Sequence, residues 1–357
     1  MTAFADHDDR FARDAPAPAA GVTAAGPRLS VDYVAAAAPQ PLLDGRDVLA
    51  VFGFGDAAPA RLDDPRYLHV PLQPHGGSAP YEVWRGGGRV VHGRDGDIAW
   101  ASDGALSFGV IEVDEAAVGI EQAAAHAYAR LLAFIAASDT PHLLRIWNYL
   151  DAITHGDGDS ERYRRFCVGR ARGLGSIDPA RLPAATAIGR CDAARVLQIY
   201  WLAAASPGTP LENPRQVSAY RYPRAYGPQP PSFARAMLPP TVDAMPLLLS
   251  GTASVVGHAT MHEGALLAQL GETFANFDAL LDAARQRQPA LPATFGAGTR
   301  LKVYVRDAAD MDTVAAALQA RFGDRVPHFL LHAAICRRQL CVEIDGVHGR
   351  ADVDNDK

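Results

Sequence analysis

The sequence has little cysteine and no long apolar run. Its 357 residues include four cysteines, and none of them forms a C-x-x-C pair, so a disulfide scaffold is not expected. The nearest approach to a membrane span, residues 244–256, is interrupted by Ser, Gly and Thr and is shorter than the roughly 18 residues that cross a bilayer. We therefore expect a cytoplasmic protein with reduced thiols and no membrane partner.

Positive charge is also scarce. Lys and Arg total 34 against 40 Asp and Glu, the formal net charge is -6, and the chain contains no basic block. Binding to nucleic acid or to an anionic membrane needs a basic surface, so we expect neither partner. An anionic ligand would have to be bound by a few locally placed arginines.

The sequence does contain enough apolar residues for two domains of ordinary size. Hydrophobic residues make up 48% of the chain, so a large core can be buried. Residues 1–30 are rich in Ala, Pro and Asp and predict a disordered tail, not a signal peptide. Residues 351–357 predict a short acidic tail.

The two halves of the chain show the same order of predicted elements. Apolar periodicity indicates a strand region, a helix, a strand, a helix and two further strands in each half. In the first half these are residues 88–113, 119–138, 142–150, 160–173, 185–191 and 196–204; in the second they are 245–260, 264–287, 299–307, 311–323, 328–336 and 340–346. We predict an α/β protein of two similar units, each a mixed β-sheet with helices on one face.

A proline-rich stretch separates the two units. Residues 206–216 contain three prolines and predict a linker between domains at 31–205 and 217–350. The stretch "CDAARVLQI" in the first unit aligns with "CRRQLCVEI" in the second, and this alignment places Gln198 opposite Glu343. Ligand sites favour such interfaces between domains.

Glu343 is the first candidate for chemistry. Alternation along the predicted strand puts it on one face with Cys341 and Asp345. A carboxylate on a strand is more often solvated, but a partly apolar pocket would raise its pKa and suit it to act as a general acid. Gln198, at the matching place in the first unit, has no proton to donate.

Cys336 stands seven residues before Glu343. A lone cysteine is usually a small core residue. Alternatively, Arg337 or Arg338 beside it could lower the pKa of its thiol, although only one of these neighbours can share its strand face.

We expect neither a metal nor an organic cofactor. His258 and His262 are four residues apart, but their segment predicts a strand end and a turn and lacks the H-E-x-x-H order. The acidic stretch before Arg162 resembles the start of a calcium loop, but Arg162 occupies the position that needs glycine. The glycine-containing segments lack the strand, turn and helix of a dinucleotide site.

The segment "QVSAYRYPRAYG", residues 216–227, is unusually rich in Tyr and Arg. It could be a boundary loop with its tyrosines packed and its arginines solvated. Alternatively, Tyr220, Tyr226 and Arg224 could form a pocket wall, because arginine binds carboxylates with two parallel hydrogen bonds and tyrosine offers a flat apolar face. Such a wall would suit a cyclic ligand with more than one carboxylate.

Five blocks of sequence, in consistent order, resemble the chorismatase family. They are "RIWNYLDAI", "ERYRRFCVGRA", "ENPRQVSAYRYPRAYGPQPPSFARA", "SGTASVVGH" and "ICRRQLCVEIDG". The resemblance implies a chorismate-cleaving enzyme without cofactor, built from two units related in fold to the RidA/YjgF imine-deaminase family. It also implies a monomer, since one chain then does what several subunits do in those relatives.

The resemblance further implies roles for individual residues. Glu343 matches the proton donor, which protonates the enolpyruvyl methylene carbon before pyruvate leaves. Cys336 and Gly251 match residues of the subtype that releases 3-hydroxybenzoate, so we expect that product, with some 4-hydroxybenzoate, over the dihydroxycyclohexadiene diol of the other subtype. For binding the carboxylates we expect these positions: Tyr149, Arg162, Tyr220, Arg224, Tyr226 and Arg306.

Two alternatives remain at this point. An imine hydrolase of the related small family would need arginine just before Leu340 and Cys341, where this chain has Gln339. A binding module for aromatic acids without catalysis would tolerate replacement of Glu343 by glutamine.

Overall fold

The computed structural model describes residues 26–176 and 178–350. The predicted tails at residues 1–25 and 351–357 lie outside this part of the chain. Residues 26–30, which were included in the predicted N-terminal tail, belong to the folded protein. Leu29 is buried, and its amide donates to the carbonyl oxygen of Ala244 at 2.9 Å.

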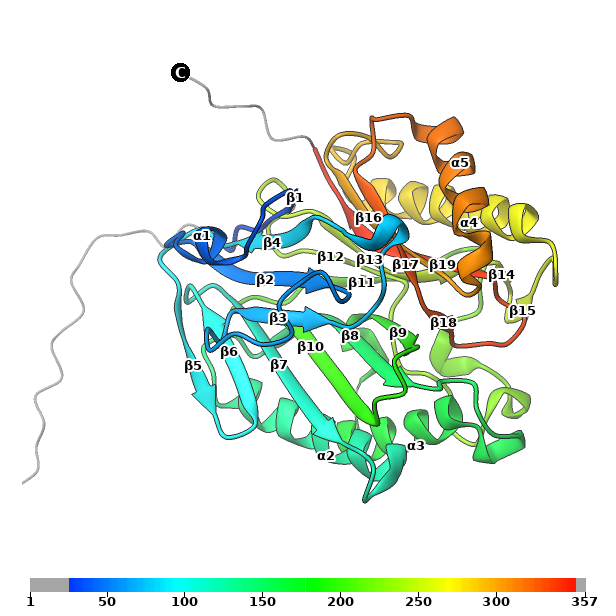
Figure 1. Cartoon of the computed structure of the whole chain (residues 1–357), viewed down its shortest axis with the longest axis horizontal. Helices are drawn as coiled ribbons and strands as arrows, with labels where there is room; N and C mark the ends of the chain where they lie inside the picture. The colour runs from blue at the N-terminus through cyan, green and yellow to red at the C-terminus, as the bar shows by residue number, and fades with distance from the viewer. Residues whose placement is uncertain (1–25, 177, 351–357) are drawn as a thin grey trace, which may run out of the picture.

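The first unit is a mixed sheet covered on its outer face by two helices (Figure 1). Its elements are β5 (Val91–Asp95), β6 (Ile98–Ser102), β7 (Leu106–Asp114), α2 (Gly119–Ala136), β8 (His142–Asp151), α3 (Arg162–Leu174), β9 (Ala184–Arg190) and β10 (Val196–Ala204). The strand order is β9-β8-β10-β7-β6-β5, with β8 and β9 parallel and the other pairs antiparallel.

The second unit repeats this arrangement. Its elements are β11 (Thr209–Leu211), β12 (Ala236–Leu238), β13 (Leu247–Ala253), α4 (Leu266–Arg287), β16 (Thr299–Val305), α5 (Met311–Phe322), β17 (His328–His332) and β19 (Val342–His348). The order β17-β16-β19-β13-β12-β11 matches the first sheet strand for strand, again with one parallel pair, β16 and β17. The predicted architecture of two helix-backed mixed sheets is confirmed. The predicted linker, however, contains β11, which pairs with β12 in the second sheet.

A third, smaller sheet was not predicted as a separate layer. It consists of β1 (Ser30–Val34), β2 (Val48–Phe54), β3 (Tyr67–Val70) and β4 (Tyr81–Arg85), with a short helix α1 (Gln40–Leu43) after β1. Its order, β1-β4-β2-β3, corresponds to β13-β19-β16-β17, and β2 and β3 are its parallel pair. It is thus a shortened third copy of the same unit, in which one helix is reduced to a turn and the other is replaced by a loop.

This third sheet packs against the other two through aromatic side chains. Phe52 contacts Tyr200 with ring centroids 5.0 Å apart, Trp84 contacts Trp147 at 5.3 Å, and Tyr33 contacts Phe329 at 4.8 Å. All residues of β2 are buried. A sheet with only one short helix of its own must bury its apolar surface against its neighbours, so this packing produces one continuous core across the three sheets.

The predicted strand at 328–336 divides between two sheets. Its first part is β17, whereas β18 (Ala334–Ile335) leaves the second unit and pairs with β9 at the edge of the first. Cys336 and the turn that follows therefore lie at the junction of the two units. A hairpin of β14 (Val255–Val256) and β15 (Ala259–Thr260) lies on the same side of the second unit.

Candidate active site

A cavity of about 440 Å³ lies where the two units meet. Its wall combines residues of α3 and β9 from the first unit with residues of β13 and β19 from the second. The segment 216–227 and the turn after β18 complete the wall. Four of the nine predicted site residues line this cavity: Glu343, Cys336, Gly251 and Tyr226.

Glu343 projects from β19 and is only 5% exposed. The pKa of its carboxyl is raised to about 8, mainly by burial and secondarily by the negative charge of Asp345, against the opposing effect of Arg145, Arg235 and Arg337. The side chain is therefore protonated at neutral pH. A buried carboxylic acid at the wall of a cavity is suited to donate a proton to a bound molecule.

Gly251 lies beside this acid at an irregularity of β13. The register between β13 and β19 shifts between Leu249 and Thr252, which marks a β-bulge. A Cβ atom at Gly251 would overlap Oε1 of Glu343. Glycine is thus required for the carboxyl group to occupy its observed position.

Cys336 completes the immediate surroundings of the acid. Its Sγ lies 3.9 Å from Oε2 of Glu343. Burial and the proximity of Glu343 raise the pKa of the thiol, and these effects outweigh the lowering by Arg337. Cys336 is therefore a neutral thiol, and the structure does not favour a thiolate nucleophile at this position.

Aromatic rings of the segment 216–227 form the wall next to the turn after β18. Tyr222 and Tyr226 contact each other with ring centroids 5.3 Å apart. The guanidinium of Arg337 lies over both rings, 4.3 Å from the centroid of Tyr226 and 5.2 Å from that of Tyr222. The hydroxyl of Tyr226 lies 3.1 Å from Nδ1 of His258, on the loop between β14 and β15.

Positive charge predominates in the cavity lining. Five arginines contribute to it: Arg164, Arg170, Arg235, Arg337 and Arg338. Three acidic residues also line it, and one of them, Glu343, is protonated at neutral pH. The side chains of Arg170 and Arg235 are buried, and the Nε atom of each has no hydrogen-bond partner among the described residues. The cavity is therefore electrostatically suited to an anion.

Arg235 also fixes the aromatic wall. Its guanidinium donates to the carbonyl oxygen of Val217 at 2.9 Å and to the hydroxyl of Tyr222 at 2.8 Å. One buried cation thus attaches the segment 216–227 to the second unit and contributes charge to the cavity.

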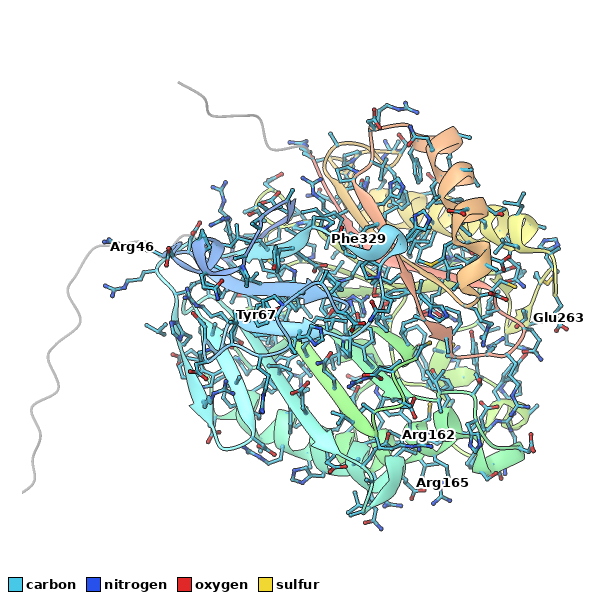
Figure 2. The ribbon with its side chains drawn as sticks, viewed as in Figure 1. Arg46, Tyr67, Arg162, Arg165, Glu263 and Phe329 are labelled. Carbon is cyan, nitrogen blue, oxygen red and sulfur yellow. The ribbon has the colours of Figure 1, made fainter. Side chains whose placement is uncertain are left out.

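The structure does not bring three of the predicted arginines to the cavity, because each is engaged elsewhere. Arg162, which is labelled at the start of α3 in Figure 2, forms an ion pair with the buried carboxylate of Glu115. Arg224 is exposed and forms two hydrogen bonds with Asp159, at 2.9 and 2.5 Å. The guanidinium of Arg306 donates to carbonyl oxygens around the turn that carries Cys336, at Ile335, Arg337 and Leu340.

Two predicted tyrosines also lie away from the cavity. Tyr149 is fully buried, and its hydroxyl lies 3.2 Å from that of Tyr200 and 3.1 Å from that of Tyr304. Tyr220, in the 3-10 turn Ala219–Arg221, has the guanidinium of Arg221 5.6 Å from its ring centroid. Tyr222, two residues further on, takes the place that was predicted for Tyr220.

Three of the arginines that line the cavity, Arg164, Arg170 and Arg235, were missed by the sequence-based prediction, and Arg337 and Arg338 were considered only as neighbours of Cys336. Arg235 and Arg170 could have been recognised, because each follows an apolar or small residue in a stretch otherwise suited to burial, "SFARA" and "CVGRA". A charged residue in such a stretch is buried only when it has partners or a ligand. Arg164 offers no comparable signal within "ERYRRF".

Within the described ranges, no group of three or more His, Cys, Asp or Glu side chains is placed to hold a metal ion. In the same part of the chain, no helix combines the length and the apolarity that a membrane crossing requires.

Comparison with known proteins indicates the family to which the chain belongs. The family model described as chorismatase FkbO/Hyg5-like, N-terminal, matches residues 82–203. A chorismatase of Streptomyces hygroscopicus is 36% identical over 271 residues, which span 74% of this chain and 78% of that protein. A 3-hydroxybenzoate synthase of the same organism is 32% identical over 315 residues, which span 85% and 92% of the two chains.

Comparison with a solved structure points to the same family. The crystal structure of a chorismatase superposes with a TM-score of 0.81 and 33% identity, covering 92% of this chain and 100% of that one. The chain belongs to the chorismatase family and is an enzyme of the chorismatase or 3-hydroxybenzoate synthase type.

Proposed function

We propose that the protein converts chorismate into 3-hydroxybenzoate, with some 4-hydroxybenzoate, and pyruvate. The observation that carries this proposal is the protonated Glu343, buried at the wall of an arginine-lined cavity beside Gly251 and the neutral thiol of Cys336. Chorismate is a cyclic dicarboxylate with an acid-labile enol ether. It therefore needs both cations and a proton donor.

The proposed reaction begins at the enolpyruvyl group. Glu343 donates its proton to the methylene carbon, which leaves an oxocarbenium centre at the ether carbon. The ring hydroxyl oxygen then bonds to the neighbouring ring carbon as the ether C–O bond breaks, and the electron pair of that bond forms the carbonyl group of pyruvate. The hydroxyl proton returns to the Glu343 carboxylate.

Aromatisation completes the reaction. The oxygen is then attached to two ring carbons, and its bond to the original hydroxyl carbon breaks with the electron pair staying on oxygen. The ring carbon that keeps the oxygen loses its hydrogen as a proton, the electron pair of that C–H bond completes the aromatic ring, and the oxygen takes up a proton to become the phenol of 3-hydroxybenzoate. Breaking the other C–O bond instead gives 4-hydroxybenzoate. Chorismate thus gives one hydroxybenzoate and one pyruvate, with no water consumed and Glu343 restored. The diol-forming reaction would instead add one water per turnover.

Incubating the purified protein with chorismate tests this proposal. Pyruvate is measured with a coupled lactate dehydrogenase assay, and the ring product is identified by chromatography against hydroxybenzoate and diol standards. Equal amounts of pyruvate and hydroxybenzoate are expected. Unchanged chorismate would overturn the proposal altogether, whereas a diol product would restrict it to the hydrolytic alternative.

Cys336→Ala is expected to shift the product from hydroxybenzoate toward the diol. Loss of the thiol leaves space next to Glu343, where a water molecule can enter and capture the cation before the ring hydroxyl does. The ratio of the two products, measured by chromatography, reports this shift. Cys341→Ala, which does not alter the cavity lining, is the matched control. An unchanged ratio in Cys336→Ala would remove this thiol from the mechanism.

Arg337→Met is expected to raise the KM for chorismate at least about tenfold. The substitution keeps the apolar stem against Tyr226 but removes a charge from the cavity wall, and a hydrogen bond between charged groups contributes about 1.5–3 kcal/mol. Arg224→Met is the control, because Arg224 lies outside the lining and pairs with Asp159. Equal KM values in the two variants would contradict a carboxylate-binding role for Arg337.

A further inference from the structure

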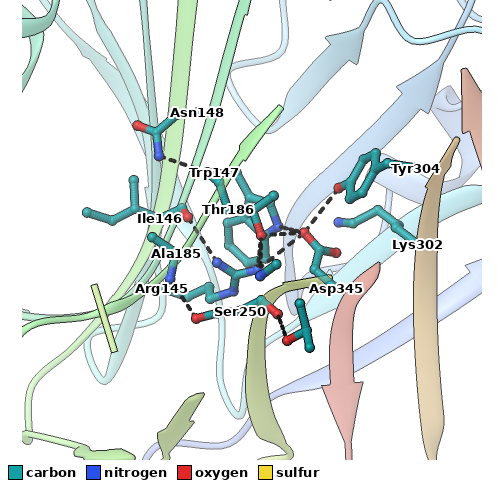
Figure 3. A network of polar contacts seen from close by, with 12 residues as sticks. Arg145, Ile146, Trp147, Asn148, Ala185, Thr186, Ser250, Lys302, Tyr304 and Asp345 are labelled. Carbon is teal, nitrogen blue, oxygen red and sulfur yellow. Dashed lines mark hydrogen bonds and ion pairs between the residues drawn. The ribbon is translucent and has the colours of Figure 1, made fainter. Parts of the chain in front are cut away.

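Two strands from different units meet directly behind the cavity. The bulge of β13 lies against β9, and two hydrogen bonds join them across the boundary (Figure 3). The amide of Ala185 donates to Oγ of Ser250 at 2.9 Å, and the amide of Gly251 donates to Oγ1 of Thr186 at 3.0 Å. Because the register of β13 and β19 is interrupted here, the bulge is held by the other unit's strand.

The hydroxyl of Thr186 has all its hydrogen-bonding capacity in use. It accepts from Gly251 and from Nη2 of Arg145, the latter at 2.6 Å, and it donates to Oδ2 of Asp345 at 2.7 Å. A hydroxyl group has one proton to donate and two lone pairs, so this set of partners fixes its orientation. Thr186 is 2% exposed but also contributes to the cavity lining.

Asp345 connects this hydroxyl to the strand of the acid. Its Oδ2 also accepts from Nη2 of Arg145 at 3.2 Å, Nε1 of Trp147 at 2.9 Å and the hydroxyl of Tyr304 at 3.1 Å (Figure 3). Glu343 and Asp345 are two residues apart on β19, so their side chains share one face of the sheet. Thr186 therefore contacts both strands that define the position of Glu343.

We propose that Thr186 is a positioning residue for the acid, holding the bulge at Gly251 and the β19 carboxylate of Asp345 at fixed distances so that Glu343 remains sheltered from water and directed into the cavity. The proposal rests on the function proposed above, because it takes Glu343 as the proton donor. Thr186 itself takes no part in bond making or breaking.

Loss of the hydroxyl leaves the amide of Gly251 without its acceptor. A buried amide without a partner is unfavourable, so water is expected to enter beside the Glu343 carboxyl and to stabilise its ionised form. The other titratable or charged groups that influence Glu343 are not themselves substituted: Asp345, Arg145, Arg235, Arg337, Cys336, Tyr163 and Arg306. The pH at which Glu343 ionises should therefore fall.

Thr186→Val tests the proposal with a side chain of nearly the same shape. We expect kcat for chorismate to fall at least about tenfold while KM changes less than twofold, and the alkaline limb of the pH profile to move to lower pH. Thr186→Ser, which retains the hydroxyl, should restore both. Thr273→Val is the matched control, because this buried threonine donates to the carbonyl oxygen of Gln269 within α4, away from the cavity.

A second readout does not require turnover. The carboxylic acid band of Glu343 in infrared difference spectra, identified by its absence in Glu343→Gln, should titrate at lower pH in Thr186→Val than in the unmodified protein. Because the infrared titration needs no substrate, it distinguishes failure of the positioning role from failure of the proposed reaction.

If the infrared titration of Glu343 has the same midpoint in Thr186→Val as in the unmodified protein, the positioning role is overturned, even if chorismate is not the substrate. If Thr186→Val does not fold, Ser250→Ala removes the other hydrogen bond between β9 and the bulge of β13 and should shift the midpoint of the infrared titration in the same direction. An unshifted midpoint in that variant would likewise reject the proposal.

Discussion

Glu343→Gln is expected to lower pyruvate release from chorismate by roughly 10³-fold, within the range found for loss of a positioned general acid. Glutamine preserves the shape of the side chain and its ability to hydrogen-bond, but it cannot transfer a proton to carbon. The coupled assay that detects pyruvate gives the rate directly. This is the largest effect that we expect from a single substitution, because the proposed reaction gives the other cavity residues a part only in binding or orienting the substrate.

The stability of this variant provides a control. The pKa of Glu343 rises from the usual 4.5 to about 8 on folding. The protonated carboxyl therefore contributes fully to stability below pH 4.5, and this contribution is lost progressively as the pH rises from 4.5 through about 8. Glutamine does not ionise, and Glu343→Gln should therefore raise the free energy of unfolding at pH 7 by about 3 kcal/mol and by little at pH 4.

Urea titrations at the two pH values measure this difference. Glu263→Gln, at an exposed position outside the cavity lining (Figure 2), should change neither stability nor activity. Full activity in Glu343→Gln would show that another group supplies the proton.

The second large effect is a loss of activity in alkaline solution. The proposed reaction needs the protonated form of Glu343, whose pKa is raised to about 8, so kcat/KM should be nearly constant from pH 6 to about pH 7 and fall tenfold per unit above about pH 8. The carboxylates of chorismate stay ionised over this range, so the alkaline limb of the pH profile reports the ionisation of a group on the enzyme and not on the substrate.

Arg337→Met provides an internal check on this assignment. The charge of Arg337 lowers the pKa of Glu343, and its removal should move the alkaline limb to higher pH. A limb that stays in place in this variant, or a rate that rises between pH 7 and pH 9, would contradict the assignment of the limb to Glu343.

The sequence was a good guide where local pattern determines structure. Alternation along 340–346 assigned Glu343 and Asp345 to one face of a strand, and β19 has this arrangement, because strand periodicity specifies which face a side chain occupies. Gly251 was expected only from the resemblance to the chorismatase family. The two helix-backed units were also predictable, since each carries long helices with clear apolar periodicity.

Arginine side chains were predicted less well. Arg162 and Arg224 were expected at the ligand, but they form ion pairs with Glu115 and Asp159, residues 47 and 65 positions away in the chain. The partner of a long flexible cation depends on tertiary packing and leaves no trace in the local pattern. The third sheet was missed for a similar reason, because it has lost the helices that mark the other two units.

The shortened third copy allows the same buried position to be compared in all three sheets. The corresponding strands β4, β10 and β19 each bury one Glu or Gln side chain. Glu82 is neutralised by Lys302 at 2.9 Å, and the amide of Gln198 is bound to Glu112 at 2.7 Å. Only Glu343 borders the cavity between the units. The threefold repetition has thus become asymmetric, because two of the equivalent side chains are paired inside the protein and only the third borders the cavity.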